Sequence, residues 1–187
     1  MPPMNRLLPR RSMLRLWIPL LGLPAGLGLG GCSSSRHMAR EPYEYRFRFG
    51  RSAILRGDRA VAPRAAPAEV QRMVAAGNRI QGLPYKFGGG HGNIEDDGYD
   101  CSGTVCYVLN HAGLLNGTKN STRLKDFGKP GPGRWVTIYA RDGHAFIVVA
   151  DLRLDTGGGR RRETRGPRWT VASREARGFH MRHPPGL

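Results

Sequence analysis

The chain has 187 residues, 39% of them hydrophobic and 24% charged, a composition that suits one globular domain with a core of ordinary size. Thirty basic residues against fourteen acidic ones give a formal net charge of +16, and only four of the basic residues are lysines. A surface of this charge attracts polymers rich in phosphate or carboxylate, which include nucleic acids, cell-wall polymers and anionic lipid head groups.

Residues 1–31 have the pattern of a bacterial export signal. Four arginines stand at its start, followed by an apolar run from Leu16 to Leu29 that is too short and too rich in glycine to span a membrane comfortably. The run ends at Leu29-Gly30-Gly31-Cys32, which resembles a lipobox: small residues before a cysteine that is diacylated and becomes the new N-terminus. The alternative is an ordinary signal peptide in which Cys32 has no such role.

Export narrows the choice of partners. Removal of residues 1–31 takes away four arginines and no acid, so 26 basic and 14 acidic residues remain, a net charge of +12. Export argues strongly against a nucleic-acid role, so we expect no nucleic-acid partner, while anionic polymers of the cell envelope stay open as partners. We expect a monomer in the bacterial cell envelope, held to a membrane through a lipid on Cys32.

The first half of the mature chain is predicted to be mainly helical. A short tether is expected over residues 36–42, and alternating aromatic and charged residues predict a strand over 43–49. Two helices are predicted, over 67–80 and 101–115, with a long glycine-rich and acidic loop between them.

The second half is predicted to consist of strands. Helices first and antiparallel strands afterwards indicate an α+β fold. We expect three parts: the signal peptide (1–31), a tether with an N-terminal strand segment (32–66) and one main domain (67–187). Strands are expected over residues 134–140, 144–150, 152–155 and 178–182, with mostly loop over 118–133 and a flexible basic loop over 157–165.

Two cysteines, Cys101 and Cys106, remain in the mature body of the chain. On one helix their Cα atoms would lie roughly 8–9 Å apart, whereas a disulfide needs less than about 7 Å, so the two thiols are expected to be free. Cys101 opens its predicted helix, where the positive end of the helix dipole favours a reactive thiolate. Cys106 lies on another face without charged neighbours and is interpreted as a buried structural residue.

His144 is the candidate base. It begins the segment His-Ala-Phe-Ile-Val-Val-Ala, whose two faces are both apolar, so this strand is expected at the centre of the sheet. An imidazole at the end of a central strand that faces a helix N-terminus is where a base for Cys101 would lie. A lone histidine beside an apolar run is more often structural, but the cysteine motif favours the base.

Three segments resemble motifs of the NlpC-type cell-wall peptidases, over about residues 68–156: Pro84-Tyr85-Lys86-Phe87-Gly88-Gly89, Tyr99-Asp100-Cys101-Ser102-Gly103 and the strand that begins at Gly143-His144. The resemblance implies a papain-like fold, in which the nucleophile begins a helix packed on a small antiparallel sheet. It implies hydrolysis of an amide bond in peptidoglycan stem peptides through a thioester, with Cys101 as nucleophile and His144 as base. It also makes Tyr85, Asp100 and Ser102 candidates for holding the free amine or a carboxylate of the substrate.

The third catalytic residue departs from the family pattern. The family places a polar residue, commonly histidine, about a dozen positions after the base, and here Asp155 and Thr156 occupy that stretch. A turn at Ala150-Asp151 that is one residue shorter favours Asp155, whose carboxylate would fix the imidazole tautomer and stabilise the imidazolium. Thr156 is the alternative.

Two other functions are open at this point. The missing histidine and the acidic loop 93–100 are compatible with an inactive, lipid-anchored protein that only binds peptidoglycan, and the same chemistry could act on an acyl lipid or another amide. His91 is interpreted as a loop histidine. We expect no cofactor and no metal, since His180, His183 and Cys106 have no recognisable zinc spacing.

Overall fold

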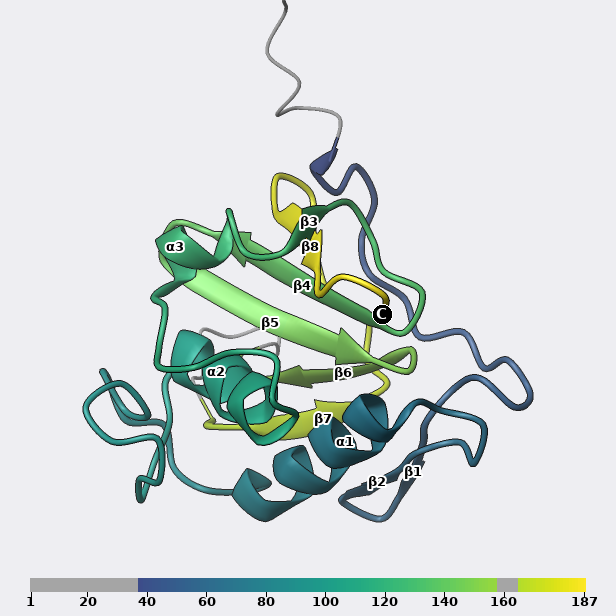
Figure 1. The fold of residues 1–187 in the computed structure, drawn as a ribbon, viewed down its shortest axis with the longest axis horizontal. Coiled ribbons are helices and arrows are strands. Elements are labelled where there is room, and N and C mark those ends of the chain that lie inside the picture. The colour runs from purple at the N-terminus through teal and green to yellow at the C-terminus, as the bar shows by residue number, and fades with distance from the viewer. Residues whose placement is uncertain (1–36, 158–164) are drawn as a thin grey trace, which may run out of the picture. The chain divides into compact units, whose positions relative to one another are not determined.

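The structure, a computed structural model, describes residues 37–157 and 165–187. Its largest element is a six-stranded antiparallel sheet, so the prediction of a mixed fold with antiparallel strands is confirmed. The strands are β3 (Lys129–Pro130), β4 (Val136–Arg141), β5 (His144–Val149), β6 (Leu152–Asp155), β7 (Arg168–Thr170) and β8 (His180–His183). Their order across the sheet is β3-β8-β4-β5-β6-β7 (Figure 1).

Strand β5 lies at the centre of the sheet, as predicted, between β4 and β6. Its register is fixed by two hairpins, one of which turns at Ala150 and Asp151 with positive φ at both residues. Such a turn matches the right-handed twist of the paired strands. Successive β5 side chains therefore face opposite sides of the sheet, with Ile147 toward one core cluster and Phe146 toward another.

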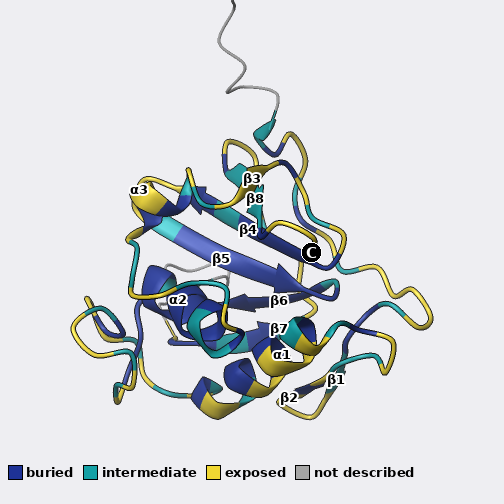
Figure 2. Ribbon diagram, in the orientation of Figure 1, coloured by how far each residue is buried: buried dark blue, intermediate teal, exposed yellow. Residues whose placement is uncertain are grey.

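Two longer helices cover one face of the sheet (Figure 1). They are α1 (Ala68–Ile80) and α2 (Cys101–His111), and a single turn, α3 (Ser121–Leu124), follows. Figure 2 shows α2 almost wholly buried, and its residues from Ser102 to Leu109 are all buried. The helix ends at His111 instead of at 115, because Gly113 adopts a positive φ and turns the chain away.

The N-terminal segment lies against the other face of the sheet. Ala39 exchanges backbone hydrogen bonds with residues 178–179, and the buried ring of Tyr43 contacts Phe146. The prediction of a free tether is therefore wrong for residues 37–42, which are bound to the segment that leads into β8.

The strand predicted over 43–49 is also wrong. Of residues 43–49, only Tyr43 makes a β-bridge, which is isolated and joins it to Arg174, and Phe49 is 96% exposed. A short hairpin follows instead, with β1 (Ile54–Arg56) and β2 (Arg59–Val61) joined at Gly57.

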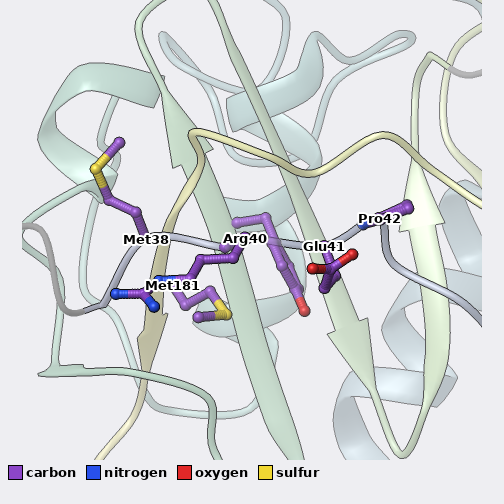
Figure 3. A pocket seen from close by; sticks show the side chains of 7 residues that line it. Met38, Arg40, Glu41, Pro42 and Met181 are labelled. Atoms are coloured by element: carbon purple, nitrogen blue, oxygen red, sulfur yellow. The ribbon is translucent and has the colours of Figure 1, made fainter.

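A shallow hollow of about 360 Å³ lies where the N-terminal segment crosses the sheet (Figure 3). Its lining consists of residues 38–42 together with Tyr139 and Met181, so no predicted site residue lines it. Within residues 37–157 and 165–187, no helix is long and apolar enough to cross a membrane. The predicted export signal, Cys32 and residues 158–164 of the predicted basic loop lie outside the described residues.

Candidate functional site

The nucleophile candidate stands at the first position of α2, directly after its N-cap. Asp100 has an extended backbone, and its Oδ1 accepts a hydrogen bond from the Gly103 N–H at 2.7 Å. This is the standard N-cap arrangement, and it explains why the aspartate precedes the cysteine. The Cys101 side chain is partly exposed and free of any disulfide.

The glycine-rich loop is pressed against the start of α2. A Cβ on Gly103 would lie 2.0 Å from the carbonyl oxygen of Gly89, so only glycine allows this approach. The Gly88 N–H donates to Asp100 Oδ2 at 3.2 Å, and the Asp100 N–H donates to the Gly89 oxygen at 3.3 Å. The Asp-Cys-Ser-Gly element and the Gly-Gly loop are thus parts of one local structure.

Tyr85 lies beside the thiol on this loop. Burial raises the pKa of its phenol, and the nearby Cys101 and Asp100 raise that pKa further. Its neighbour Lys86 binds Asp96 and Asp97 at 2.6 and 2.7 Å, which ties both ends of the loop together. Tyr85 is partly exposed and its phenol interacts electrostatically with Cys101, so it is an accessible polar group near the thiol.

His144 lies between a thiol and a carboxylate. Its side chain is 17% exposed, and its Nε2 is 3.0 Å from Asp155 Oδ1. Burial lowers the pKa of His144, but hydrogen bonds to Asp155 and to Cys101 outweigh burial and raise the pKa to about 9. Because Asp155 occupies Nε2, Nδ1 is the ring nitrogen left for the Cys101 thiol.

Asp155, the last residue of β6, is the carboxylate that His144 meets. Its Oδ1 also accepts the Gly157 N–H at 3.0 Å, so this oxygen is held by a main-chain donor as well. Thr156, the alternative orienter, is 2% exposed, and its Oγ1 has no hydrogen-bond partner among the described residues. The contact geometry therefore favours Asp155 over Thr156.

The sequence did not indicate the role of His91. Its Nε2 lies 3.1 Å from Asp100 Oδ1 and 3.0 Å from Ser102 Oγ, and Ser102 donates to the same Asp100 oxygen at 3.0 Å. Asp100 and Ser102 are both buried and paired with each other, so of the three predicted substrate-binding residues only Tyr85 is partly exposed. The position of His91 after three glycines gave no signal of this contact, since it depends on how the loop turns back.

Cys106 is buried on the far side of α2, as predicted. Its Sγ donates to the Lys119 carbonyl at 3.3 Å and accepts the Lys119 N–H at 3.2 Å. Burial raises the pKa of this thiol to about 11. Cys106 therefore anchors the loop after α2 and is protonated at neutral pH.

The two thiols should differ in reactivity toward an alkylating reagent. We expect iodoacetamide to label Cys101 at least about tenfold faster than Cys106 near neutral pH, because only the accessible thiolate reacts. Mass mapping of the labelled peptides over time measures both rates in one sample. Equal labelling of the two cysteines in folded protein would contradict the assignment of Cys101 as the reactive thiol.

No family model matches the chain, and the curated proteins contain no match to it. The site therefore has to be interpreted from its own geometry. It brings a thiol, an imidazole and a carboxylate together from α2, β5 and β6, the arrangement that activates a nucleophile by general base catalysis. In the part of the chain that the structure describes, no three His, Cys, Asp or Glu side chains are grouped so as to hold a metal ion.

Proposed function

We propose that the chain is a cysteine hydrolase of papain-like fold that cleaves amide bonds in peptidoglycan stem peptides. His144, whose pKa is raised to about 9, holds the proton taken from the Cys101 thiol; the thiolate attacks the carbonyl carbon, and the imidazolium gives that proton to the leaving amine. Water then hydrolyses the thioester and regenerates the thiol. The backbone N–H of Cys101, in the first turn of α2, has no intrahelical acceptor and can donate to the oxyanion.

One observation carries the proposal: His144 lies between the Cys101 thiol and the carboxylate of Asp155, with its Nε2 3.0 Å from Asp155 Oδ1. A histidine with only a structural role can use any hydrogen-bonding partner. His144 instead lies between the thiol at the N-terminus of α2 and the buried carboxylate of Asp155. The cysteine is also partly exposed, as a nucleophile must be.

The substrate class rests on other features. The motifs around Tyr85 and Cys101 resemble those of NlpC-type peptidases, and the N-terminal residues resemble a lipoprotein export signal. A stem peptide carries carboxylates, which suits an exported protein with an excess of arginine.

Incubation of the full chain with purified muropeptides tests the proposal. We expect products whose masses sum to the parent plus one water, formed by wild type and not by Cys101→Ala. Muropeptides that bind without being cleaved would support the inactive peptidoglycan-binding protein instead. Cleavage only of acyl esters or of unrelated amides would move the same chemistry to another substrate.

The lipid anchor gives a separate prediction. Cys32→Ser should move the protein from the membrane fraction to the soluble fraction, because a serine at this position cannot take the thioether-linked diacylglycerol. Cell fractionation followed by immunoblotting measures the change, with Cys106→Ser as the matched cysteine control. A Cys32→Ser protein that stays in the membrane fraction would show that the lipobox interpretation is wrong.

A further inference from the structure

The carboxylate of Asp155 has a second set of partners, on the oxygen that His144 does not use. Its Oδ2 accepts a hydrogen bond from Nη1 of Arg153, and Nε of Arg174 lies 3.6 Å from the same oxygen. Oδ1 is shared between His144 and the Gly157 N–H. One oxygen of the carboxylate thus faces the histidine, and the other faces two arginines.

Arg153 is enclosed to an unusual degree for an arginine. It is 0% exposed, its Nη2 donates to the Ala172 oxygen at 3.2 Å, and its guanidinium lies 5.9 Å from the centre of the Phe146 ring. A charge is buried at this depth only when it is paired. Such a pair adds little stability compared with apolar residues of the same volume, so stability alone does not account for an arginine here.

We propose that Arg153 is a positioning residue, which holds Asp155 with Oδ1 toward His144 and offsets much of the negative charge of the carboxylate. Asp155 then orients the imidazole mainly as a hydrogen-bond acceptor, and less as a counter-ion. This inference rests on the proposed function in one respect, the role of His144 as the base. In that mechanism the imidazolium must release its proton to the leaving amine, and a carboxylate without Arg153 would hold that proton more tightly.

Among residues 37–157 and 165–187, Arg153 is the main buried positive charge beside Asp155. Burial raises the pKa of Tyr43, so this phenol is neutral and contributes no charge. Arg174 is farther from the carboxylate than Arg153, and its side chain is 21% exposed. In the part of the chain that the structure describes, the titratable or charged groups that face Asp155, His144 and Arg153 include Cys101 from α2, Arg174 from the segment after β7, and Tyr43 from the N-terminal segment.

The midpoint of His144 titration separates this role from a purely structural one. We propose to follow the imidazole Cε1 resonance by NMR in the full chain in detergent, assigned by its absence in His144→Gln. In Arg153→Met the midpoint should rise by roughly one pH unit from the wild-type value of about 9, since loss of a positive charge favours imidazolium. Arg153→Lys should stay close to wild type, and Asp155→Asn should lower the midpoint.

If Arg153 had only a structural role, its replacement would shift the His144 midpoint in the opposite direction. If its loss only loosened the site and admitted water, the midpoint would fall toward the ordinary value of 6.5. An unchanged or lowered midpoint in folded Arg153→Met would therefore overturn the proposal. If Arg153→Met does not fold, Arg153→Gln provides the same test, because glutamine keeps a hydrogen-bond donor and removes the positive charge; the same rise is expected, and no rise would overturn the proposal.

The titration needs no substrate, so it can fail independently of the proposed function. A chain that cleaves no muropeptide but shows the upward shift would contradict the hydrolase and leave the role of Arg153 intact. If wild type cleaves muropeptides, the alkaline limb of the kcat/KM profile of Arg153→Met should move to higher pH with the His144 midpoint. The KM of this variant should stay within about twofold of wild type.

Discussion

Cys101→Ala should abolish amide cleavage, with a loss of at least about 10³-fold in turnover, because no other group in the site can form the thioester. The fold should survive, since alanine is the best helix former and Cys101 is a partly exposed residue at the first position of α2. Product masses measure the loss, and circular dichroism checks that the secondary structure is unchanged.

Cys106→Ala is the matched control on the same helix. It removes a buried thiol and its two hydrogen bonds to Lys119, so some stability should be lost while most activity is kept. Full activity in Cys101→Ala would exclude Cys101 as nucleophile, and loss of activity only in Cys106→Ala would move the assignment to the buried thiol.

The elements that the sequence predicted well are those with strong local signals. Strand β6 has the predicted bounds, and α1 begins one residue later than predicted. Glycines with positive φ end α1 at Gly82 and turn the chain before β5 at Gly143. At these positions the glycines and the hydrophobic periodicity indicate the same element boundaries. Each of these boundaries depends on a few neighbouring residues.

The segments that the sequence predicted wrongly depend on contacts between distant residues. Tyr43 and Tyr45 alternate like strand residues, but each hydroxyl donates to a backbone oxygen elsewhere, in Asp151 and in Ala53. Strand β7 was not predicted, because it is only three residues long and its Trp169 packs where Gly77 of α1 leaves room. The periodicity of a segment contains no information on such partners.

In the candidate site, too, some residues could be predicted from local sequence signals and others could not. Cys101, His144 and Asp155 were named from motif and spacing, and the structure brings these three together. The contacts of His91 and Arg153 were not foreseen. Arg153 is buried because residues 39–43 cover its face of the sheet, and the sequence predicts a tether and the start of a strand for that segment.

Asp155→Asn should lower turnover by about 10²–10⁴-fold, with a smaller effect on substrate binding. Asparagine keeps the shape of the side chain, but its amide can present a donor to Nε2 of His144 in place of an acceptor, which favours the wrong tautomer. It also leaves the buried Arg153 without its counter-charge, so a loss of stability should accompany the loss of turnover. Rates on stem peptides and thermal unfolding of the same samples separate the two effects.

Thr156→Ala is the control, because it tests the other residue that could orient the base. Its Oγ1 is buried without a hydrogen-bond partner among the described residues, so removing it should cost little or even stabilise the protein, and turnover should stay within about threefold of wild type. A damaging Thr156→Ala with a silent Asp155→Asn would move the orienter by one residue. If wild type cleaves stem peptides and neither Asp155→Asn nor His144→Ala changes turnover, the imidazole is not the base. Only a different partner for the Cys101 thiol could then account for the activity.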